Sequence, residues 1–513
     1  MLARVDTIAL DGIRAIPVEV EVDLGRGLPM LNMVGLPDGA VREAKDRVRA
    51  ALKNSGVQLP SRRITINLAP AHLPKEGSGY DLPMAMGLLV AMEKLPQSAL
   101  QGRLFLGELS LDGRLKPVPG CLSAAMHARD QGVRELIVPV GNGVEGSLAG
   151  VRVVAPERLL DLMRHLAGET LLEPVPETDW RSWLAAARPE EGGKIRDLLD
   201  VKGQEHARRA LEVAAAGGHN LIMSGPPGSG KTLLARCLPG ILPPLTLEEA
   251  LEVTAIHSVA GRLDGGHPLV GSRPFRTPHH TSSDVALIGG GSTPRPGEVS
   301  LAHRGVLFLD EIPEFGRHAL EALREPLEAG EVGIARAARS TRFPARFQLV
   351  SACNPCPCGH LGNPQRSCRC SPVQVERYAS RLSGPLLDRI DLHVDVPPVP
   401  PETLTALPGG ESSGEVRARV IEARARQLAR NGTGLLNSDL DGRVLAAHTV
   451  LDSDGQALLL TASRRLGFSA RAHNRILRVA RTIADLEGAE NIGFGHLAEA
   501  IQFRVGGKLP GIS

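Results

Sequence analysis

Residues 225–232, with the sequence GPPGSGKT, constrain the fold of this chain more than any other segment. The octet fits G-x-x-x-x-G-K-[ST], the pattern of a phosphate-binding P-loop. An apolar run, residues 220–224, precedes it, and a helical pattern, residues 233–238, follows it, as this motif requires. The backbone N–H groups of such a loop converge on one anion, and the helix dipole favours negative charge there. The expected phosphate contacts are Gly225, Pro226, Pro227, Gly228, Ser229, Gly230, Lys231 and Thr232.

An acidic pair supplies the second half of the predicted nucleotide site. Residues 305–309 form an apolar run typical of a buried parallel strand, and Asp310 and Glu311 follow it directly. Lys231 is expected to reach the β- and γ-phosphates, while Thr232 and Asp310 hold Mg²⁺. Glu311 is expected to accept a proton from an attacking water. The sequence therefore predicts an ATPase with ATP and Mg²⁺ as cofactors; a strand that merely ends in a helix-capping acidic pair is the alternative.

Composition narrows the class of protein. The 513 residues carry a formal net charge of only +2, so any nucleic-acid contact has to come from a local feature. Aromatic residues make up 3% of the chain, which argues against base stacking as the dominant mode of binding. No apolar stretch is long enough to span a bilayer, and the first four residues do not resemble a signal peptide. A cytoplasmic location without membrane contact is therefore expected.

The pattern along the chain predicts five parts. Residues 1–168 alternate strand-like and helix-like segments, and residues 196–396 hold the expected ATPase core with a parallel sheet. Residues 169–195 and 397–414 are predicted linkers, since Pro, Gly, Ser and acidic residues interrupt the periodicity there. Residues 415–513 are predicted to be helical. The first of these helices is expected to bury one face, made of Val416, Val420, Ala423 and Leu428.

Three further polar side chains extend the predicted machinery. Asn354 ends the apolar strand 349–353, where it is expected to orient a water near the γ-phosphate. Arg389 follows a helix-like segment, and an arginine supplied by a neighbouring subunit would stabilise transition-state charge. Arg471 lies on a predicted helix that Ser469 opens, from which it is expected to reach the γ-phosphate. For each arginine, a solvated or salt-bridged surface position is the alternative.

The order of these motifs resembles the AAA+ ATPases, and within them the magnesium-chelatase branch. RTPHH at 276–280, PGEVSLAHRGVLFLDEIPEF at 296–315 and NPCPCG at 354–359 resemble the ComM/YifB family of bacterial ATPases. The resemblance spans almost the whole chain. It implies an α/β fold with an AAA+ P-loop core and parallel sheet, an α+β amino-terminal domain and a carboxyl-terminal helical lid.

The resemblance also implies roles for residues and partners. It makes Lys231 and Thr232 the Walker A residues, Asp310 and Glu311 the Walker B pair, Asn354 sensor 1, Arg389 the trans-acting finger and Arg471 sensor 2, with Arg381 and Arg475 as nearby alternatives for the arginines. The family is expected to form hexameric rings. ComM-type members are regarded as DNA helicases that drive branch migration during natural transformation, so single-stranded and branched DNA are the implied partners.

The pattern of residues 331–346 predicts a basic hairpin, two strands joined by a polar turn near residues 339–341. Similar insertions in related ring ATPases project into the central pore, where arginines would contact phosphates without reading sequence. An ordinary solvated hairpin is the alternative. The Gly-rich segment 289–297 is a candidate second pore loop. The local charge is +3, from one glutamate and the candidate DNA contacts Arg336, Arg339, Arg342 and Arg346.

Five of the seven cysteines lie between residues 353 and 370. Cys356, Cys358, Cys368 and Cys370 form two C-x-C pairs, and four thiolates suit a structural tetrahedral zinc site. Free thiols in a loop are the alternative, and Cys353 is a candidate substitute ligand, although its position in a predicted strand favours burial. His279 and His280 are expected to be structural, since no partner lies at metal-ligand spacing.

The amino-terminal part resembles the proteolytic domain of Lon-type proteases, with the ribosomal S5 domain 2-like fold, through residues 73–81 and 107–113. Lon uses a Ser–Lys dyad. Matching the motifs puts Gly79 in the place of the serine and Leu122 in the place of the lysine, with Ser78 adjacent. The domain is therefore expected to be an inactive peptidase that acts as a scaffold or a DNA contact.

Two other functions compete with a DNA motor. The first is a chelatase motor that inserts magnesium into a porphyrin with partner subunits. The second is a regulatory scaffold ring, against which the intact pair of Lys231 and Glu311 argues.

Overall fold

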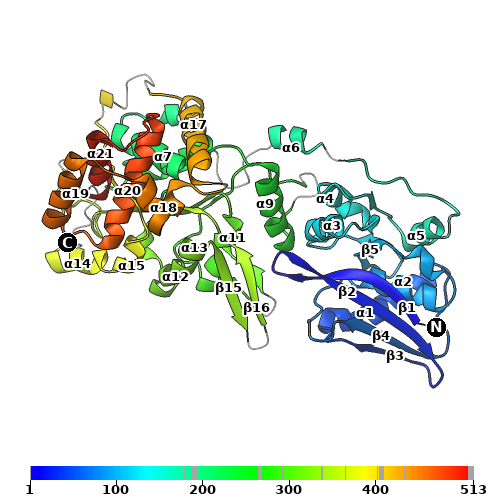
Figure 1. Ribbon diagram of the computed structural model, residues 1–513. Helices are drawn as coiled ribbons and strands as arrows, with labels where there is room; N and C mark the ends of the chain where they lie inside the picture. Colours follow the sequence, from blue (N-terminus) through cyan, green and yellow to red (C-terminus); the bar gives the residue numbers. More distant parts are fainter. Residues whose placement is uncertain are drawn as a thin grey trace.

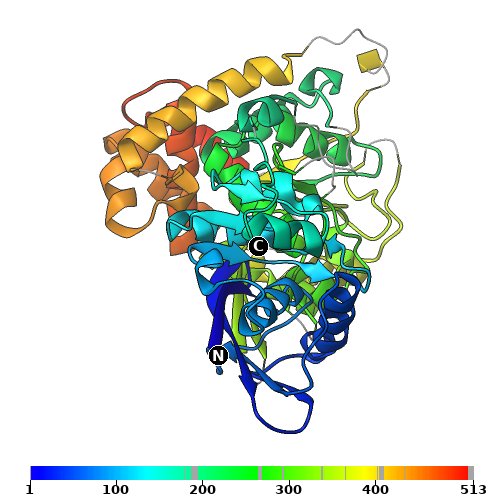
Figure 2. The same ribbon diagram turned by 90° about the vertical axis from the view of Figure 1, so that its right-hand side faces the viewer.

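The computed structural model describes residues 2–177, 179–186, 195–263, 268–291, 294–336, 339–363, 366–400, 402–403, 410–432 and 434–505. Figure 1 shows two lobes: an amino-terminal domain, blue to cyan, and a larger lobe, green to red. Figure 2, turned by 90°, looks onto the amino-terminal domain in front of the larger lobe. None of the described helices combines the length and the hydropathy that crossing a bilayer requires.

A mixed seven-stranded sheet, in the order β3-β4-β2-β1-β5-β8-β9, forms the amino-terminal domain. β1 and β2 form a long antiparallel hairpin in which side chains alternate, so Ala3 and Val5 are buried while Arg4 faces outward. Asp38 caps helix α1 by accepting a hydrogen bond from the Val41 N–H at 2.7 Å. The elements are β1 (Leu2–Asp11), β2 (Arg14–Gly25), β3 (Met30–Val34), α1 (Gly39–Asn54), β4 (Arg63–Ala69), α2 (Asp81–Ala91), β5 (Arg103–Phe105), β6 (Glu108–Leu109), β7 (Leu115–Lys116), α3 (Cys121–Asp130), β8 (Glu135–Ile137), α4 (Gly143–Ser147), β9 (Val153–Val154) and α5 (Leu159–Leu166).

Five parallel strands, in the order β11-β14-β17-β10-β18, form the sheet of the larger lobe. β10 lies between two other strands and all of its residues are buried, which explains its apolar run. This parallel sheet confirms the predicted α/β fold. The elements are α7 (Glu205–Gly217), β10 (Leu221–Ser224), α8 (Lys231–Ile241), α9 (Leu247–Val259), β11 (Phe275–Arg276), α10 (Asp284–Ile288), β12 (Gly289–Gly290), β13 (Arg295–Pro296), α11 (Glu298–Leu301), β14 (Val306–Leu309), α12 (Arg317–Ala322), α13 (Arg324–Ala329), β15 (Glu331–Arg336), β16 (Arg339–Pro344), β17 (Gln348–Cys353), α14 (Pro372–Ala379), α15 (Gly384–Leu387) and β18 (Leu392–Asp395).

The carboxyl-terminal helices share one hydrophobic core with β10, α7 and α8. They are α17 (Ser413–Asn431), α18 (Gly442–His448), α19 (Ser453–Leu466), α20 (Ala470–Leu486) and α21 (Phe494–Val505). The predicted buried face of α17 is wrong at one position, because Leu428 is 41% exposed. Gln427 is buried instead, and its Nε2 donates to the carbonyl oxygen of Ala216 at 3.1 Å. Gln427 therefore occupies the core position that hydrophobic periodicity predicted for Leu428, because its amide finds a buried acceptor.

Both predicted linkers contain ordered structure. Helix α6 (Trp180–Ala186) lies within 169–195, and Trp180 and Trp183 pack against a buried cluster to which both lobes contribute. α17 begins at Ser413, inside 397–414, with Ser412 and Glu415 forming a capping box. Residues 178, 187–194, 401 and 404–409 of these linkers lie outside the described residues.

Helix α9 joins the two lobes (Figure 1). Its Leu251 and Ala255 belong to the same buried cluster as Leu122 of α3. The Ser258 hydroxyl donates to Glu145 Oε1 at 2.5 Å and accepts from the N–H of Gly120 at 2.9 Å. The amino-terminal domain is thus packed against the larger lobe through apolar and polar contacts, which fix their relative position.

Candidate active site

The P-loop connects β10 to α8 at the carboxyl edge of the parallel sheet. Gly228 and Gly230 have positive φ angles of 78° and 95°, a conformation in which most side chains are strained. A Cβ on Gly225 would collide with the carbonyl oxygen of Val396 at the end of β18. The glycines of the octet are therefore required by backbone conformation and by close packing, in agreement with a loop that presents N–H groups to an anion.

Lys231 is the first residue of α8, and its side chain is almost buried. Its Nζ donates to the carbonyl oxygens of Gly225 at 2.7 Å and Pro226 at 2.9 Å, and lies 3.4 Å from Asn354 Oδ1. Burial lowers the pKa of this amine, while the charges of Asp310 and Glu311 act in the opposite direction. The amine is thus held between the P-loop and the end of β17, where a phosphate could replace the loop carbonyls as its partner.

Thr232 and Asp310, the predicted magnesium ligands, are in direct contact. The Thr232 hydroxyl donates to Asp310 Oδ2 at 2.8 Å, and the N–H of Glu311 donates to Asp310 Oδ1 at 3.0 Å. A hydroxyl and a carboxylate side by side are hard oxygen donors of the kind that Mg²⁺ prefers. The residues present therefore fit a magnesium ion bound together with a nucleotide.

Glu311 has a φ of 51°, in the left-handed region that a side chain of this size rarely adopts. Such backbone strain is concentrated at functional sites. The Glu311 side chain is half exposed, and its Oε2 lies 3.9 Å from Nδ1 of His280. The imidazole of His280 is in turn in contact with that of His279, with ring centroids 4.1 Å apart and ring planes tilted by 33°. Sequence reasoning missed this neighbour of the acidic pair, although the RTPHH motif had marked the segment.

Strand order explains why these groups meet. β17 lies between β10 and β14, and the carboxyl ends of parallel strands share one edge of a sheet. Asn354, which follows β17, is therefore placed between the P-loop and the acidic pair. Five predicted site residues come together at this edge: Lys231, Thr232, Asp310, Glu311 and Asn354.

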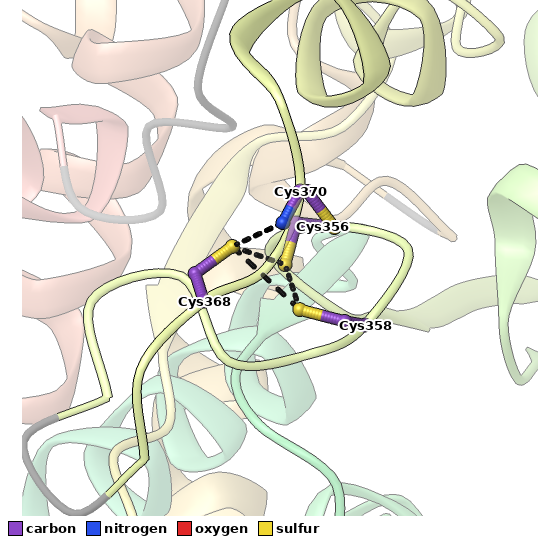
Figure 3. A group of neighbouring side chains, drawn as sticks. All are labelled: Cys356, Cys358, Cys368 and Cys370. Atoms are coloured by element: carbon purple, nitrogen blue, oxygen red, sulfur yellow. Dashed lines mark hydrogen bonds between the residues drawn. The ribbon is translucent and has the colours of Figure 1, made fainter.

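The four paired cysteines converge directly after Asn354 (Figure 3). All four sulfur atoms lie within 4.8 Å of one another, with Sγ–Sγ distances of 3.4 Å (Cys356–Cys358), 3.7 Å (Cys356–Cys368) and 3.6 Å (Cys358–Cys368). A tetrahedron with zinc–sulfur bonds of about 2.3 Å has sulfur–sulfur edges of about 3.8 Å, so this cluster fits a four-thiolate metal site. Cys353, a buried residue of β17, is not part of the cluster.

Backbone groups support thiolates in this cluster. The N–H groups of Leu361 and Cys370 each point at a sulfur atom, of Cys356 and Cys368, at 3.4 Å. Hydrogen bonds from the backbone at Arg369 and His360 lower the pKa of Cys358 to about 6. For Cys368 the hydrogen bond from the Cys370 backbone also favours the thiolate, but the neighbouring sulfurs raise its pKa to about 12. The backbone N–H groups thus favour a thiolate at Cys358, and a divalent cation would relieve the repulsion among the neighbouring sulfurs.

The cysteine loop also contacts the P-loop. Gly359, with a φ of 77°, lies so close to Pro227 that an added Cβ would be 2.5 Å from its Cδ. The same Cβ would be 3.8 Å from Cγ of Asn354. The loop that carries the cysteines is therefore a wall of the phosphate site, which no sequence spacing indicated.

Arg389 and Arg471 lie at the opposite edge of the sheet from Lys231. Together with Arg475 and Arg478 of α20 they line a cavity of about 860 Å³. Residues that precede the strands, among them Asn220 and Gly305, line it as well, which places it at the amino edge. Neither arginine is therefore beside the P-loop of its own chain. Arg381 is different: its Nη1 donates to Glu314 Oε2 at 2.7 Å, three residues after Glu311.

A buried network positions the arginines of this cavity. Arg389 is 7% exposed; it donates to the carbonyl oxygen of Pro385 at 2.6 Å and pairs with Glu328. Arg475 Nη1 lies 2.5 Å from Asp391 Oδ1. Burial would raise the pKa of Asp391, but its hydrogen bond with His219 and the charge of Arg475 hold it below the usual range. This carboxylate therefore stays ionised and fixes the Arg475 guanidinium.

β15 and β16 form the predicted basic hairpin, but residues 339–341, the predicted turn, belong to β16. Arg336 lies opposite Arg339; residues 337–338, and the side chains of Arg336 and Arg339, lie outside the described part. Arg342 is on β16, and its Nη1 lies 2.5 Å from Glu331 Oε1 across the pair. Arg346 comes after the hairpin and lines the arginine cavity instead.

Two other turns contact this hairpin. The Gly-rich segment 289–297 forms a second hairpin, β12 with β13, and an added Cβ on Gly289 would be 2.9 Å from Cδ1 of Ile334. Residues 292–293 of that segment lie outside the described residues. Gly12, in the turn between β1 and β2, touches the carbonyl oxygen of Arg342. The amino-terminal domain therefore contacts the arginine-bearing hairpin directly.

The Lon-like motifs form a structural cluster. The Ser78 hydroxyl donates to Glu108 Oε2, and Leu122 is completely buried. The nearest motif lysine, Lys75, is buried and donates to the carbonyl oxygen of Pro70. Arg47 forms a bidentate ion pair with Asp81 at 2.7 and 2.9 Å. Within the described residues no serine–lysine hydrogen bond is found at these motifs.

Three family descriptions match successive parts of the chain. "Subunit ChlI of Mg-chelatase" matches residues 20–142, "Magnesium chelatase, subunit ChlI" matches residues 197–404, and "Magnesium chelatase, subunit ChlI C-terminal" matches residues 410–504. The second of these covers the P-loop, the acidic pair and the cysteine cluster, so the predicted resemblance to the magnesium-chelatase branch is confirmed.

Relatives match over nearly the full length. The chain is 48% identical to the YifB protein of Salmonella typhimurium, over 98% of this chain and 97% of that protein. It is 45% identical to the competence protein ComM of Haemophilus influenzae, again over 98% and 97%. The magnesium-chelatase 38 kDa subunit of Cereibacter sphaeroides is 26% identical over 58% of this chain and 87% of that protein. Since both YifB and ComM match from end to end, the chain belongs to the ComM/YifB family of magnesium-chelatase-like AAA+ proteins.

Proposed function

We propose that the chain is an ATP-hydrolysing ring motor that acts on DNA, as a cytoplasmic helicase that promotes branch migration of recombination intermediates in natural transformation. ATP and Mg²⁺ are its cofactors, a homo-hexamer is its working form, and single-stranded and branched DNA are its partners. The observation that carries the proposal is the meeting of the P-loop, the acidic pair and Asn354 at one sheet edge. The name and the end-to-end similarity of the competence protein ComM support the DNA role.

Hydrolysis follows from the roles of five side chains. The P-loop N–H groups and the Lys231 ammonium hold the β- and γ-phosphates. Thr232 and Asp310 would hold Mg²⁺, which would neutralise charge on the phosphate oxygens. Glu311 accepts the proton of the attacking water, and Asn354 orients that water. In a ring with head-to-tail contacts, Arg389 of one chain approaches the γ-phosphate bound by the next, and the same holds for Arg471.

Packing gives a route from this site to the hairpin. Val332 and Phe343, on the inner faces of β15 and β16, belong to the same buried cluster as Leu309 and Ile312, which flank the acidic pair. Cores of this kind are densely packed and transmit small displacements. A shift of the acidic pair during hydrolysis would therefore move the hairpin and the DNA that its arginines contact.

Replacing Arg336, Arg339 and Arg342 together by Ala is expected to weaken binding of single-stranded DNA about tenfold and to leave basal ATP hydrolysis near the wild-type rate. Loss of three phosphate contacts should reduce the slope of log K against log salt by about two units. Fluorescence anisotropy over a salt series measures both. Arg324→Ala is the control, because this arginine is partly exposed but paired with Glu321 outside the hairpin. Equal salt slopes in the triple variant and the wild type would rule out the hairpin as a DNA contact.

We further propose that the cysteine cluster holds a structural zinc ion. Metal analysis of protein purified without chelator is expected to give about one zinc per chain, since four thiolates complete a tetrahedron. Replacing Cys356, Cys358, Cys368 and Cys370 by Ser should remove the metal and weaken nucleotide binding, because the cysteine loop contacts the P-loop through Gly359. Cys121→Ala, in the amino-terminal domain, is the control and should keep the metal. Wild-type protein without bound metal, or a quadruple variant that retains it, would contradict the assignment.

The main test is strand displacement on a three-strand DNA junction by the wild type and by Lys231→Ala. ATP-dependent displacement that the variant lacks supports the proposal. A chelatase-type motor is the second candidate, supported by the similarity to the magnesium-chelatase 38 kDa subunit. ATP hydrolysis that responds to porphyrin-binding partner subunits and not to DNA would favour that second function.

A further inference from the structure

One segment of the amino-terminal domain is strongly positive, whereas the chain as a whole is nearly neutral. Residues 24–63 contain eight basic and three acidic side chains, a local excess of five positive charges, whereas the complete chain has a net charge of +2. Seven of the eight basic residues are exposed: Arg26, Arg42, Lys45, Arg49, Lys53, Arg62 and Arg63. The eighth, Arg47, is held by Asp81. We call these seven residues the amino-terminal basic surface.

The fold gathers these side chains. Arg42, Lys45, Arg49 and Lys53 follow one another at intervals of three or four residues, which places them on one exposed face of α1, beside the buried face of Val41, Ala44 and Val48. Helix α1 connects the parallel strands β3 and β4, so it runs antiparallel to them and ends near the point where they begin. Arg63 starts β4, opposite Met30 of β3, and Arg26 directly follows β2. Figure 1 shows β3, β4 and α1 together in one part of the domain.

Acidic neighbours do not neutralise this surface. Asp38 caps α1, and Glu43 lies 3.9 Å from Arg47, which leaves the exposed Asp46 as the third acid of the segment. No ion pair joins any of the seven basic residues to an acid in the part of the chain that the structure describes. Two other exposed arginines of the domain differ, since Arg114 pairs with Asp112 at 2.7 Å and Arg129 with Asp130 at 3.0 Å. Unpaired cations at this density attract a polyanion.

We propose that the amino-terminal basic surface binds the phosphate backbone of duplex DNA, independently of sequence. Residues 24–63 contain no Phe, Tyr or Trp, so the stacking platforms that single strands use are absent from this segment. Basic side chains on successive helical turns instead match the regular charges of a duplex. This inference rests on the proposed function and deepens it: the hairpin contacts the strand that is moved, and the amino-terminal domain holds a duplex arm of the branched substrate. The contact of Gly12 with Arg342 then connects the two DNA-binding parts within one chain.

The test is the triple variant Arg42→Gln, Lys45→Gln and Arg49→Gln in the full-length chain. Binding to a mixed-sequence duplex of about 30 base pairs should weaken about tenfold, and the slope of log K against log salt should fall by two to three units, roughly 0.9 for each lost phosphate contact. Binding to single-stranded oligo(dT) and basal ATP hydrolysis should remain at wild-type levels. The matched control replaces Arg4, Arg114 and Arg129 by Gln, which removes the same charge from exposed but paired positions of the same domain.

Each outcome decides between the possibilities. A triple variant with the duplex affinity and the salt slope of the wild type would overturn the inference, and so would a control variant that weakens duplex binding equally. An unchanged duplex affinity with altered ring assembly would make the surface a protein interface, to which the exposed apolar side chains Leu28, Met30 and Val34 beside it would then belong. Wild-type protein that binds neither duplex nor single strand would instead contradict the proposed function itself.

Discussion

Glu311→Gln is expected to leave ATP binding nearly unchanged and to slow ATP hydrolysis by a factor of about 10²–10⁴, the usual contribution of a positioned general base. The amide keeps the shape of the side chain but cannot accept the proton of an attacking water. Lys231→Ala is expected to fail at the earlier step, nucleotide binding. Its ammonium lies between the P-loop carbonyls and Asn354, where the phosphates have to bind, so its removal should abolish nucleotide binding together with hydrolysis.

Two measurements separate these effects. Titration with a fluorescent ATP analogue reports binding, and phosphate release under single-turnover conditions reports hydrolysis, each with and without DNA. Glu321→Gln is the matched control, because this carboxylate is paired with Arg324 on the surface of α12. Hydrolysis by Glu311→Gln at the wild-type rate would exclude Glu311 as the base. The imidazole of His280 lies 3.9 Å from Glu311. In a chain with intact Glu311, slower hydrolysis by His280→Ala would show that the histidine orients the base.

The parts of the site that sequence predicted are local patterns. The P-loop octet, the acidic pair after an apolar strand and Asn354 after another are each encoded within about ten residues, and a central parallel strand has to be apolar because it is buried on both faces. Their meeting at one edge follows once the strands are parallel. Thr232 and Asp310 are separated by 78 positions in the chain, yet the topology brings the hydroxyl within 2.8 Å of the carboxylate.

The parts that sequence did not predict depend on tertiary packing. Gln427 replaces Leu428 in the core because a carbonyl of α7 happens to accept its amide, which periodicity cannot reveal. Residues 339–341 are polar enough for a turn, but the register of β15 and β16 puts them in a strand. The contact of Gly359 with Pro227 and the packing of α9 against α3 join segments that carry no common motif. Arg471 was expected near the γ-phosphate, and its placement at the amino edge follows from how α20 packs on α7.

Arg389 lines the same cavity at the amino edge of the sheet, and its replacement is the second large expected effect. Arg389→Ala should reduce ATP hydrolysis by a factor of about 10³–10⁵, as removal of an arginine finger does. In its own chain Arg389 lies at the amino edge of the sheet and Lys231 at the carboxyl edge, so in the proposed ring the arginine would serve the phosphate bound by a neighbour. Arg381→Ala is the control: this arginine lies beside Glu314, close to the acidic pair of its own chain, and its loss should have a much smaller effect.

Mixing two inactive variants tests the direction of this contact. Arg389→Ala chains keep an intact P-loop, and Lys231→Ala chains keep an intact Arg389. In a ring assembled from equal amounts of both, about a quarter of the interfaces combine the intact P-loop of one chain with the intact arginine of the next, so hydrolysis should reappear. Glu328→Gln separates folding from catalysis, because it breaks the ion pair of Arg389 without removing the guanidinium. Mixed rings no more active than either variant alone would mean that Arg389 acts within its own chain, through Glu328, and that the head-to-tail active site does not exist.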